Sequence, residues 1–124
     1  MGEFTTDIVL LNAVVATTTQ VAPGVAVGDR SNLGIQVSGT AITSGNGVFK
    51  IQVSNDGINW VYYNRLVQNS TVTAGSTPAL VNSETISANG SKFLFVPDGD
   101  HFKYIRASVT RTTDGTYTAI LHGV

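Results

Sequence analysis

Cysteine is absent from this 124-residue chain. Without thiols the protein can form no disulfide and can offer no thiolate ligand to a metal, and the composition leaves the redox compartment open. Stability must therefore come from the packing of side chains or from assembly with other chains.

Charged residues are also scarce. They make up 12% of the chain, and the seven basic side chains nearly cancel the eight acidic ones. An average soluble domain has a charged share of about 25%. The surface must be built from Thr, Ser, Asn, Gln and Gly, which suits dense packing against other protein. The lack of a basic patch argues against binding to nucleic acid or to anionic lipid.

Long apolar runs and helical periodicity are missing as well. No stretch approaches the roughly 20 apolar residues of a membrane span, and no signal peptide is recognisable, so we expect a soluble product made in the cytoplasm. Apolar residues nowhere repeat with a helical period over a useful length. Residues 66–90 are expected to be partly irregular, with a helix of one or two turns as an alternative.

Apolar and polar residues do alternate in several short segments, which is the pattern of half-buried β-strands. The clearest example is a hairpin predicted over residues 47–65, in which Phe49, Ile51 and Val53 point to one face. We place Trp60 in the core beside Val53, because its indole would bury more area than any other side chain. The predicted structural residues of this hairpin are Ser54, Asp56, Gly57 and Trp60.

The period of the apolar run at residues 7–16 does not separate a buried strand from a short helix, but its Val and Ile content favours a strand. Brief strands are expected at residues 84–86 and 92–96. The same alternation as in the hairpin predicts strands at residues 33–38, 103–110 and 116–122. The pair Asp114 and Gly115 separates the last two of these segments, and an Asp-Gly turn between alternating runs predicts a second hairpin. About eight or nine short strands make an all-β fold, an antiparallel β-sandwich or jelly roll. We assign residues 7–124 to this single domain and residues 1–6 to a flexible N-terminal arm.

No motif for catalysis or metal binding is complete. His101 and His122 lack partners at metal-ligand spacing, and no serine lies in a nucleophile elbow. The aspartates that fall in turns are Asp56, Asp98, Asp100 and Asp114. Calcium could gather such oxygens, most readily at residues 98–100, but capping of the turns is a sufficient reason for them. We therefore predict a protein that is not an enzyme and needs no cofactor or metal ion.

Other residues are candidates for an interaction surface. Arg106 stands within an alternating strand, either with its stem over Tyr104 or paired across an interface. The tyrosines Tyr62, Tyr63 and Tyr104 could line a sugar-binding platform, although aromatic residues on a sheet more often pack across strands. The N-terminal apolar run adds four more residues. The possible interface residues are Ile8, Val9, Leu10, Leu11 and Arg106.

The segment VSNDGINW, residues 53–60, resembles the S-x-D-G-x-x-W turn of discoidin-like (F5/8 type C) sandwiches. A wider resemblance joins FKIQVSNDGINW and YIRASVTRTTDGTYTAIL to small β-sandwich proteins in the virions of tailed bacteriophages. This second resemblance implies a capsid decoration (cement) protein that stabilises the head through contacts with the major capsid protein. The discoidin-like motif implies the alternative, a carbohydrate-binding module of a tail fibre or a secreted protein.

A virion protein of this kind is expected on the capsid surface after synthesis in the host cytoplasm, without nucleic acid or membrane as a partner. Few charges and an apolar N-terminal run predict a homo-oligomer, and a trimer suits the threefold points of an icosahedral shell. Each further contact of a trimer then forms at high effective concentration.

Overall fold

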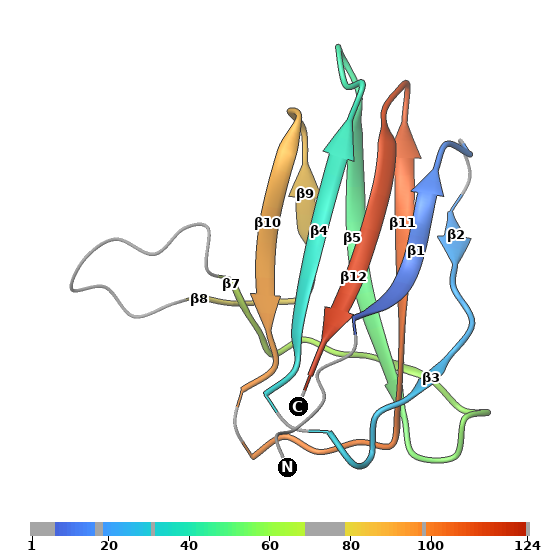
Figure 1. The fold of residues 1–124 in the computed structure, drawn as a ribbon, viewed down its shortest axis with the longest axis vertical. Helices are drawn as coiled ribbons and strands as arrows, with labels where there is room; N and C mark the ends of the chain where they lie inside the picture. Colours follow the sequence, from blue (N-terminus) through green and yellow to red (C-terminus); the bar gives the residue numbers. More distant parts are fainter. Residues whose placement is uncertain (1–6, 17–18, 31, 69–78, 98, 124) are drawn as a thin grey trace.

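The computed structural model describes residues 7–16, 19–30, 32–68, 79–97 and 99–123. These residues form twelve strands in two antiparallel sheets that pack face to face (Figure 1). The predicted all-β sandwich is confirmed, and the jelly roll stays a prediction. More strands are present than the eight or nine expected, because segments of only two or three residues pair at the margins of the sheets.

Sheet A holds, in order, β1 (Ile8–Val14), β12 (Thr116–His122), β4 (Gly34–Thr40), β10 (Gly90–Phe95), β7 (Leu66–Gln68) and β8 (Ala79–Val81). Sheet B holds β2 (Gln20–Val21), β11 (Tyr104–Thr112), β5 (Asn46–Ser54) and β6 (Val61–Tyr62). In the same sheet β3 (Val25–Ala26) pairs with β11, and β9 (Glu84–Ile86) pairs with β5. The chain therefore crosses repeatedly from one sheet to the other.

Some of the sequence predictions concern residues that the structure does not describe. The predicted arm, residues 1–6, and part of the stretch expected to be irregular, residues 69–78, lie outside the described residues. The described parts of residues 66–90 contain strands and no helix, so the alternative of a short helix finds no support in them. No helix that could cross a membrane occurs in the part of the chain that the structure describes.

The core lies between the two inner faces, where every second residue of a long strand is buried. Sheet B contributes Phe49, Ile51 and Val53 of β5 and Ile105, Ala107 and Val109 of β11. Sheet A contributes Ile35 and Val37 of β4, Leu94 of β10, and Tyr117, Ala119 and Leu121 of β12. Full burial of one large apolar side chain contributes about 1.5–3 kcal/mol. The alternation read from the sequence is thus the alternation between core and solvent.

The predicted hairpin of the last two strands is wrong, because β11 belongs to sheet B and β12 to sheet A. The corner between them is fastened to the β4–β5 loop. The Asp114 carboxylate accepts hydrogen bonds from the backbone N–H groups of Thr43, Ser44 and Gly45, at 3.2, 3.2 and 2.9 Å, and also from the Thr43 hydroxyl. Apolar and polar residues alternate in the same way in two strands of one hairpin and in two strands that face each other across a core. The sequence pattern therefore did not distinguish a hairpin from a crossing between the sheets.

Tyr117 fills the space at this corner. Its side chain is fully buried, and Cβ atoms built on Gly39, Gly47 and Gly115 would come within 3.0, 2.5 and 2.4 Å of its side-chain atoms. The Tyr117 hydroxyl donates to the carbonyl oxygen of Asp114 at 2.9 Å, and its ring meets Phe49 edge-on. The three glycines therefore leave a cradle for this ring, and Tyr117 is the central aromatic residue of the core.

We expect Tyr117→Ala to lower the free energy of unfolding by about 3–5 kcal/mol, because it empties a fully buried aromatic site. Trp60→Ala should cost only about 1 kcal/mol, the value of a partly exposed cation–π contact, since Trp60 lies outside the core cluster. Urea denaturation of both variants measures the difference. Equal losses would show that Trp60 is as essential to the fold as Tyr117.

A second prediction concerns pH. Hydrogen bonds, first from the Thr43 hydroxyl and then from the loop amides, lower the pKa of Asp114 from 3.8 to about 2. A depressed folded-state pKa adds stability that is present above the unfolded-state pKa and is lost as pH falls through the folded-state value. The thermal midpoint of Asp114→Asn should therefore fall less than that of the wild type between about pH 5 and pH 2. Parallel pH profiles of the two proteins would contradict this.

Candidate functional site

The turn after β5 is built by its own side chains. The Ser54 hydroxyl accepts hydrogen bonds from the N–H groups of Asp56 and Gly57, at 3.2 and 2.9 Å, and donates to the Asp56 carboxylate. The same carboxylate accepts from the backbone of Asn59 and Ile58, both at 2.8 Å. These bonds hold the pKa of Asp56 well below its usual range. Gly57 takes a φ of +75°, which a residue without Cβ adopts at little cost.

This turn directs Trp60 to the outer face of sheet B, so the prediction that Trp60 lies in the core is wrong. Residue Tyr62 pairs with Gln52, and the backbone of Tyr63 bonds to that of Ile51. With a period of two, Tyr63 is buried and Trp60 and Tyr62 point outward. The sequence predicted the turn itself. It did not predict which side chains of the following strand face the core, because that depends on how the seven residues between the paired Val53 and Val61 are accommodated.

The indole of Trp60 spans sheet B. The guanidinium carbon of Arg106 on β11 lies 4.3 Å from the ring centroid, and a Cβ built on Gly24, between β2 and β3, would lie 2.6 Å from the far edge of the ring. In the order of sheet B, β5 and β11 lie between β6 and Gly24, so the side chain must cross β5 and β11 to reach Gly24. Arg106 therefore stacks on Trp60 and not on Tyr104 as expected.

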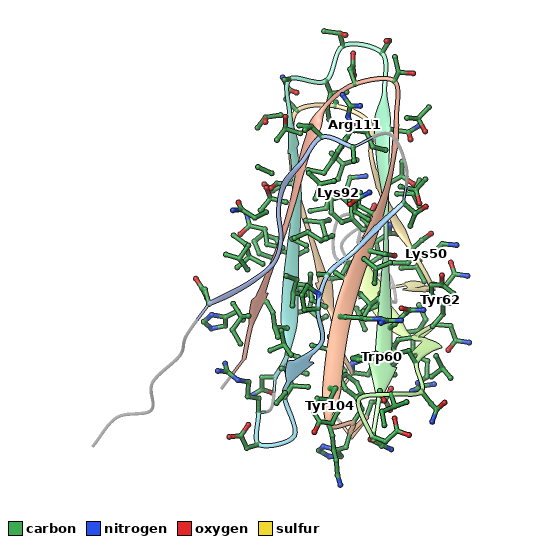
Figure 2. All side chains as sticks on the ribbon, turned by 90° about the vertical axis from the view of Figure 1, so that its right-hand side faces the viewer. Lys50, Trp60, Tyr62, Lys92, Tyr104 and Arg111 are labelled. Atoms are coloured by element: carbon green, nitrogen blue, oxygen red, sulfur yellow. The ribbon has the colours of Figure 1, made fainter. Side chains whose placement is uncertain are left out.

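Further polar and aromatic groups surround the indole. The Arg106 Nε donates to the Gln52 side-chain oxygen at 2.6 Å, and the Lys50 Nζ lies 5.4 Å from the centroid of the Tyr62 ring. Figure 2 shows Lys50 and Tyr62 on the same outer side of the sandwich. We call this surface the aromatic face, and it consists of Lys50, Gln52, Trp60, Tyr62, Tyr104 and Arg106.

The opposite surface, the outer face of sheet A, carries exposed apolar side chains. Phe93 and Phe95 of β10 are 44% and 40% exposed and stack with their ring centroids 6.3 Å apart. Cross-strand pairing continues the surface through neighbouring strands, so the apolar face consists of Val9, Val67, Leu80, Phe93, Phe95 and Ile120. The sequence predicted a strand here, but the outward direction of both phenylalanines was missed. The unbroken apolar run of residues 93–96 could have indicated it, because such a run places apolar side chains on both faces of the strand.

A groove of about 330 Å³ lies beside the two phenylalanines and is also lined by Gln36. At its end Asp7 and His122 form a contact of 2.7 Å between carboxylate oxygen and ring nitrogen. Apart from these two residues, the groove is lined by side chains that carry no charge. The apolar face therefore offers area to bury with little charge to desolvate.

The N-terminal run is arranged differently from the expectation. Leu10 and Leu11 are only 4% and 5% exposed and belong to the core of the protein itself, and Ile8 packs against that core. Among the four residues of this run that were predicted as interface residues, Val9 points outward, at 54% exposure. Three of the five possible interface residues are thus occupied within the fold.

The loop end of the sandwich has a shallow hollow of about 620 Å³, lined in part by Asp56, Asp100 and His101. Asp100 accepts hydrogen bonds from the Tyr63 hydroxyl and from the Arg65 Nε, the latter at 3.0 Å, and these bonds lower its pKa. Burial and the bond to Asp100 raise the pKa of Tyr63, which is buried and cannot belong to a sugar-binding platform.

The carboxylates of Asp56, Asp100 and Asp114 are all engaged by protein donors, whereas Asp98 lies outside the described residues. Within the described ranges, no group of three or more His, Cys, Asp or Glu side chains could hold a metal ion.

No protein-family model matches the sequence, and no curated protein is similar to it. Among solved structures, the chain resembles the crystal structure of the SPBc2 prophage-derived protein YomS. The TM-score is 0.62 at 13% sequence identity, and the match covers 98% of this chain and 94% of that chain. The likeness shows a shared fold over nearly the whole length of both chains.

Proposed function

We propose that this protein is a non-enzymatic structural protein of a bacteriophage virion, in the simplest case a capsid decoration (cement) protein. The apolar face is the observation that carries the proposal, because it offers a protein partner a surface that the fold leaves uncovered. The shared fold with a prophage-derived protein supports a phage origin. The partner would be the major capsid protein, at the capsid surface, after synthesis in the host cytoplasm.

The energetics of the apolar face favour such a contact. Contiguous exposed apolar surface on a soluble protein marks sites of protein–protein interaction. Burial of each phenylalanine that is now exposed adds part of the roughly 1.5–3 kcal/mol of full burial. Asp7 and His122, which contact each other, are the only ionisable residues that line the groove, so binding requires little desolvation of charge.

The proposal predicts that Phe93→Ala/Phe95→Ala weakens binding to capsids at least about tenfold, a loss of about 1.4 kcal/mol or more. Cosedimentation with purified capsids that lack the protein measures this binding. Tyr62→Ala, on the opposite face, is the matched control and should bind as the wild type does. Unchanged binding of the double variant, with an unchanged melting temperature, would refute a role of the apolar face.

The assembly state is a separate prediction. We expect a homo-oligomer, and sedimentation equilibrium should give about three times the chain mass of 13.0 kDa. Since Leu10 and Leu11 are buried, the contacts between copies cannot use these two side chains. A monomer that persists at high concentration would contradict the trimer.

A second candidate function is favoured by one observation. A carbohydrate-binding module, of a tail fibre or a secreted protein, needs aromatic side chains exposed together on one face. On the aromatic face Tyr62 is exposed and Trp60 is half-buried, and Tyr104 lies half-buried beside the turn at its end.

A further inference from the structure

We infer that the aromatic face binds an anionic polysaccharide, whose sugar rings pack on Trp60 and Tyr62 and whose acidic groups pair with Arg106 and Lys50. This inference rests on the carbohydrate-binding candidate and names the chemical class of its ligand. We infer this ligand class from the charge and the shape of the side chains on the aromatic face.

The charge on the aromatic face is uncompensated. Arg65 and Lys92 each form an ion pair, with Asp100 and Glu84, whereas Lys50 and Arg106 pair with no carboxylate among the described residues. The outward residues of β5 and β11 include no acid; they are Asn46, Val48, Lys50, Gln52, Ser54, Tyr104, Arg106, Ser108, Thr110 and Thr112. An anionic group placed here meets two cations without a competing carboxylate on these strands.

The cations are also fixed in position. Lys50 pairs with Ser108, and Arg106 pairs with Gln52, so the two cations are diagonal neighbours on adjacent strands, with backbones about 7–8 Å apart. Gln52 holds the Arg106 Nε, and among the described residues neither terminal amine of Arg106 has a hydrogen-bond partner. Those amines can receive a carboxylate, sulfate or phosphate in the two-pronged manner of guanidinium groups.

The rings supply the second half of the recognition. The indole of Trp60 is held by its contact with the Arg106 guanidinium and by the close approach to Gly24, so its ring is fixed in position before any ligand arrives. A pyranose ring has an apolar face of C–H groups that packs on such a surface. Fixing the aromatic groups in advance reduces the entropy lost on binding.

A polysaccharide fits this face better than a nucleic acid does. Nucleic-acid binding draws its affinity from many neutralised phosphates, and proteins that bind this way are generally basic. This chain has a pI of about 6.0 and a formal charge of −1. Two isolated cations match a polymer whose acidic groups are sparse, such as one acid on each sugar.

The test uses the single tryptophan, because Trp60 reports on this face alone. The full chain is titrated with polygalacturonate, heparin and glycerol-phosphate teichoic acid, with methyl-esterified polygalacturonate and dextran as neutral polymers. At least one acidic polymer should change the Trp60 fluorescence and bind at least about tenfold more tightly than both neutral ones. Added salt should weaken this binding.

Arg106→Gln and Lys50→Gln should each weaken binding of that polymer about tenfold. Lys103→Gln is the matched control, since it removes an exposed cation that precedes β11 and lies beside Gly28, outside the aromatic face, and Phe93→Ala tests the opposite sheet. Both controls should bind as the wild type does. Circular dichroism melting of each variant separates a loss of binding from a loss of folding.

The outcomes separate the inference from the function on which it rests. Equal binding of acidic and neutral polymers, unaffected by Arg106→Gln, would overturn the anionic ligand and leave a carbohydrate-binding protein. No binding to any polysaccharide would overturn both. Binding of oligothymidylate as tight as that of the best polysaccharide would overturn the assignment to glycans in favour of nucleic acid.

Discussion

The packing of Tyr117 into its glycine cradle is the constraint on which the rest of the sandwich depends. The cradle draws on both sheets, because Gly39 belongs to β4 of sheet A and Gly47 to β5 of sheet B. A Cβ on Gly45 would lie 2.1 Å from the carbonyl oxygen of Thr112, so the β4–β5 loop and the β11–β12 corner are in direct contact. Two crossings between the sheets are thereby held together at one corner.

The sequence predicted the strands well and their partners poorly. Alternation identifies which side chains of a strand face the core, and residues such as Ile105 and Leu121 are buried as expected. Alternation does not predict which strand pairs with which, because that pairing depends on contacts between residues far apart in the chain. A contact between the sheets illustrates this: the buried Glu84 of sheet B meets the partly exposed Lys92 of sheet A at 3.2 Å.

The candidate surfaces were less predictable than the core, for a physical reason. Outer faces carry the residues that packing does not determine, so Trp60, Phe93 and Phe95 read as core residues on hydrophobicity alone. A shift of one residue in strand parity moves a side chain from the core to solvent. In the central hairpin that parity placed Tyr63 inside and Trp60 outside, although the indole is the larger ring.

The two surfaces are independent because the core separates them. The apolar face belongs to sheet A and the aromatic face to sheet B, and the described strand residues of the two faces touch only through buried side chains between them. A protein that lies on a capsid with sheet A must present sheet B away from the shell. The placement of charge agrees with such a division, since Lys50 and Arg106 stand on the face that would meet solvent and the phenylalanines stand on the face that would be covered. A two-layer sandwich can therefore combine attachment and display without a second domain.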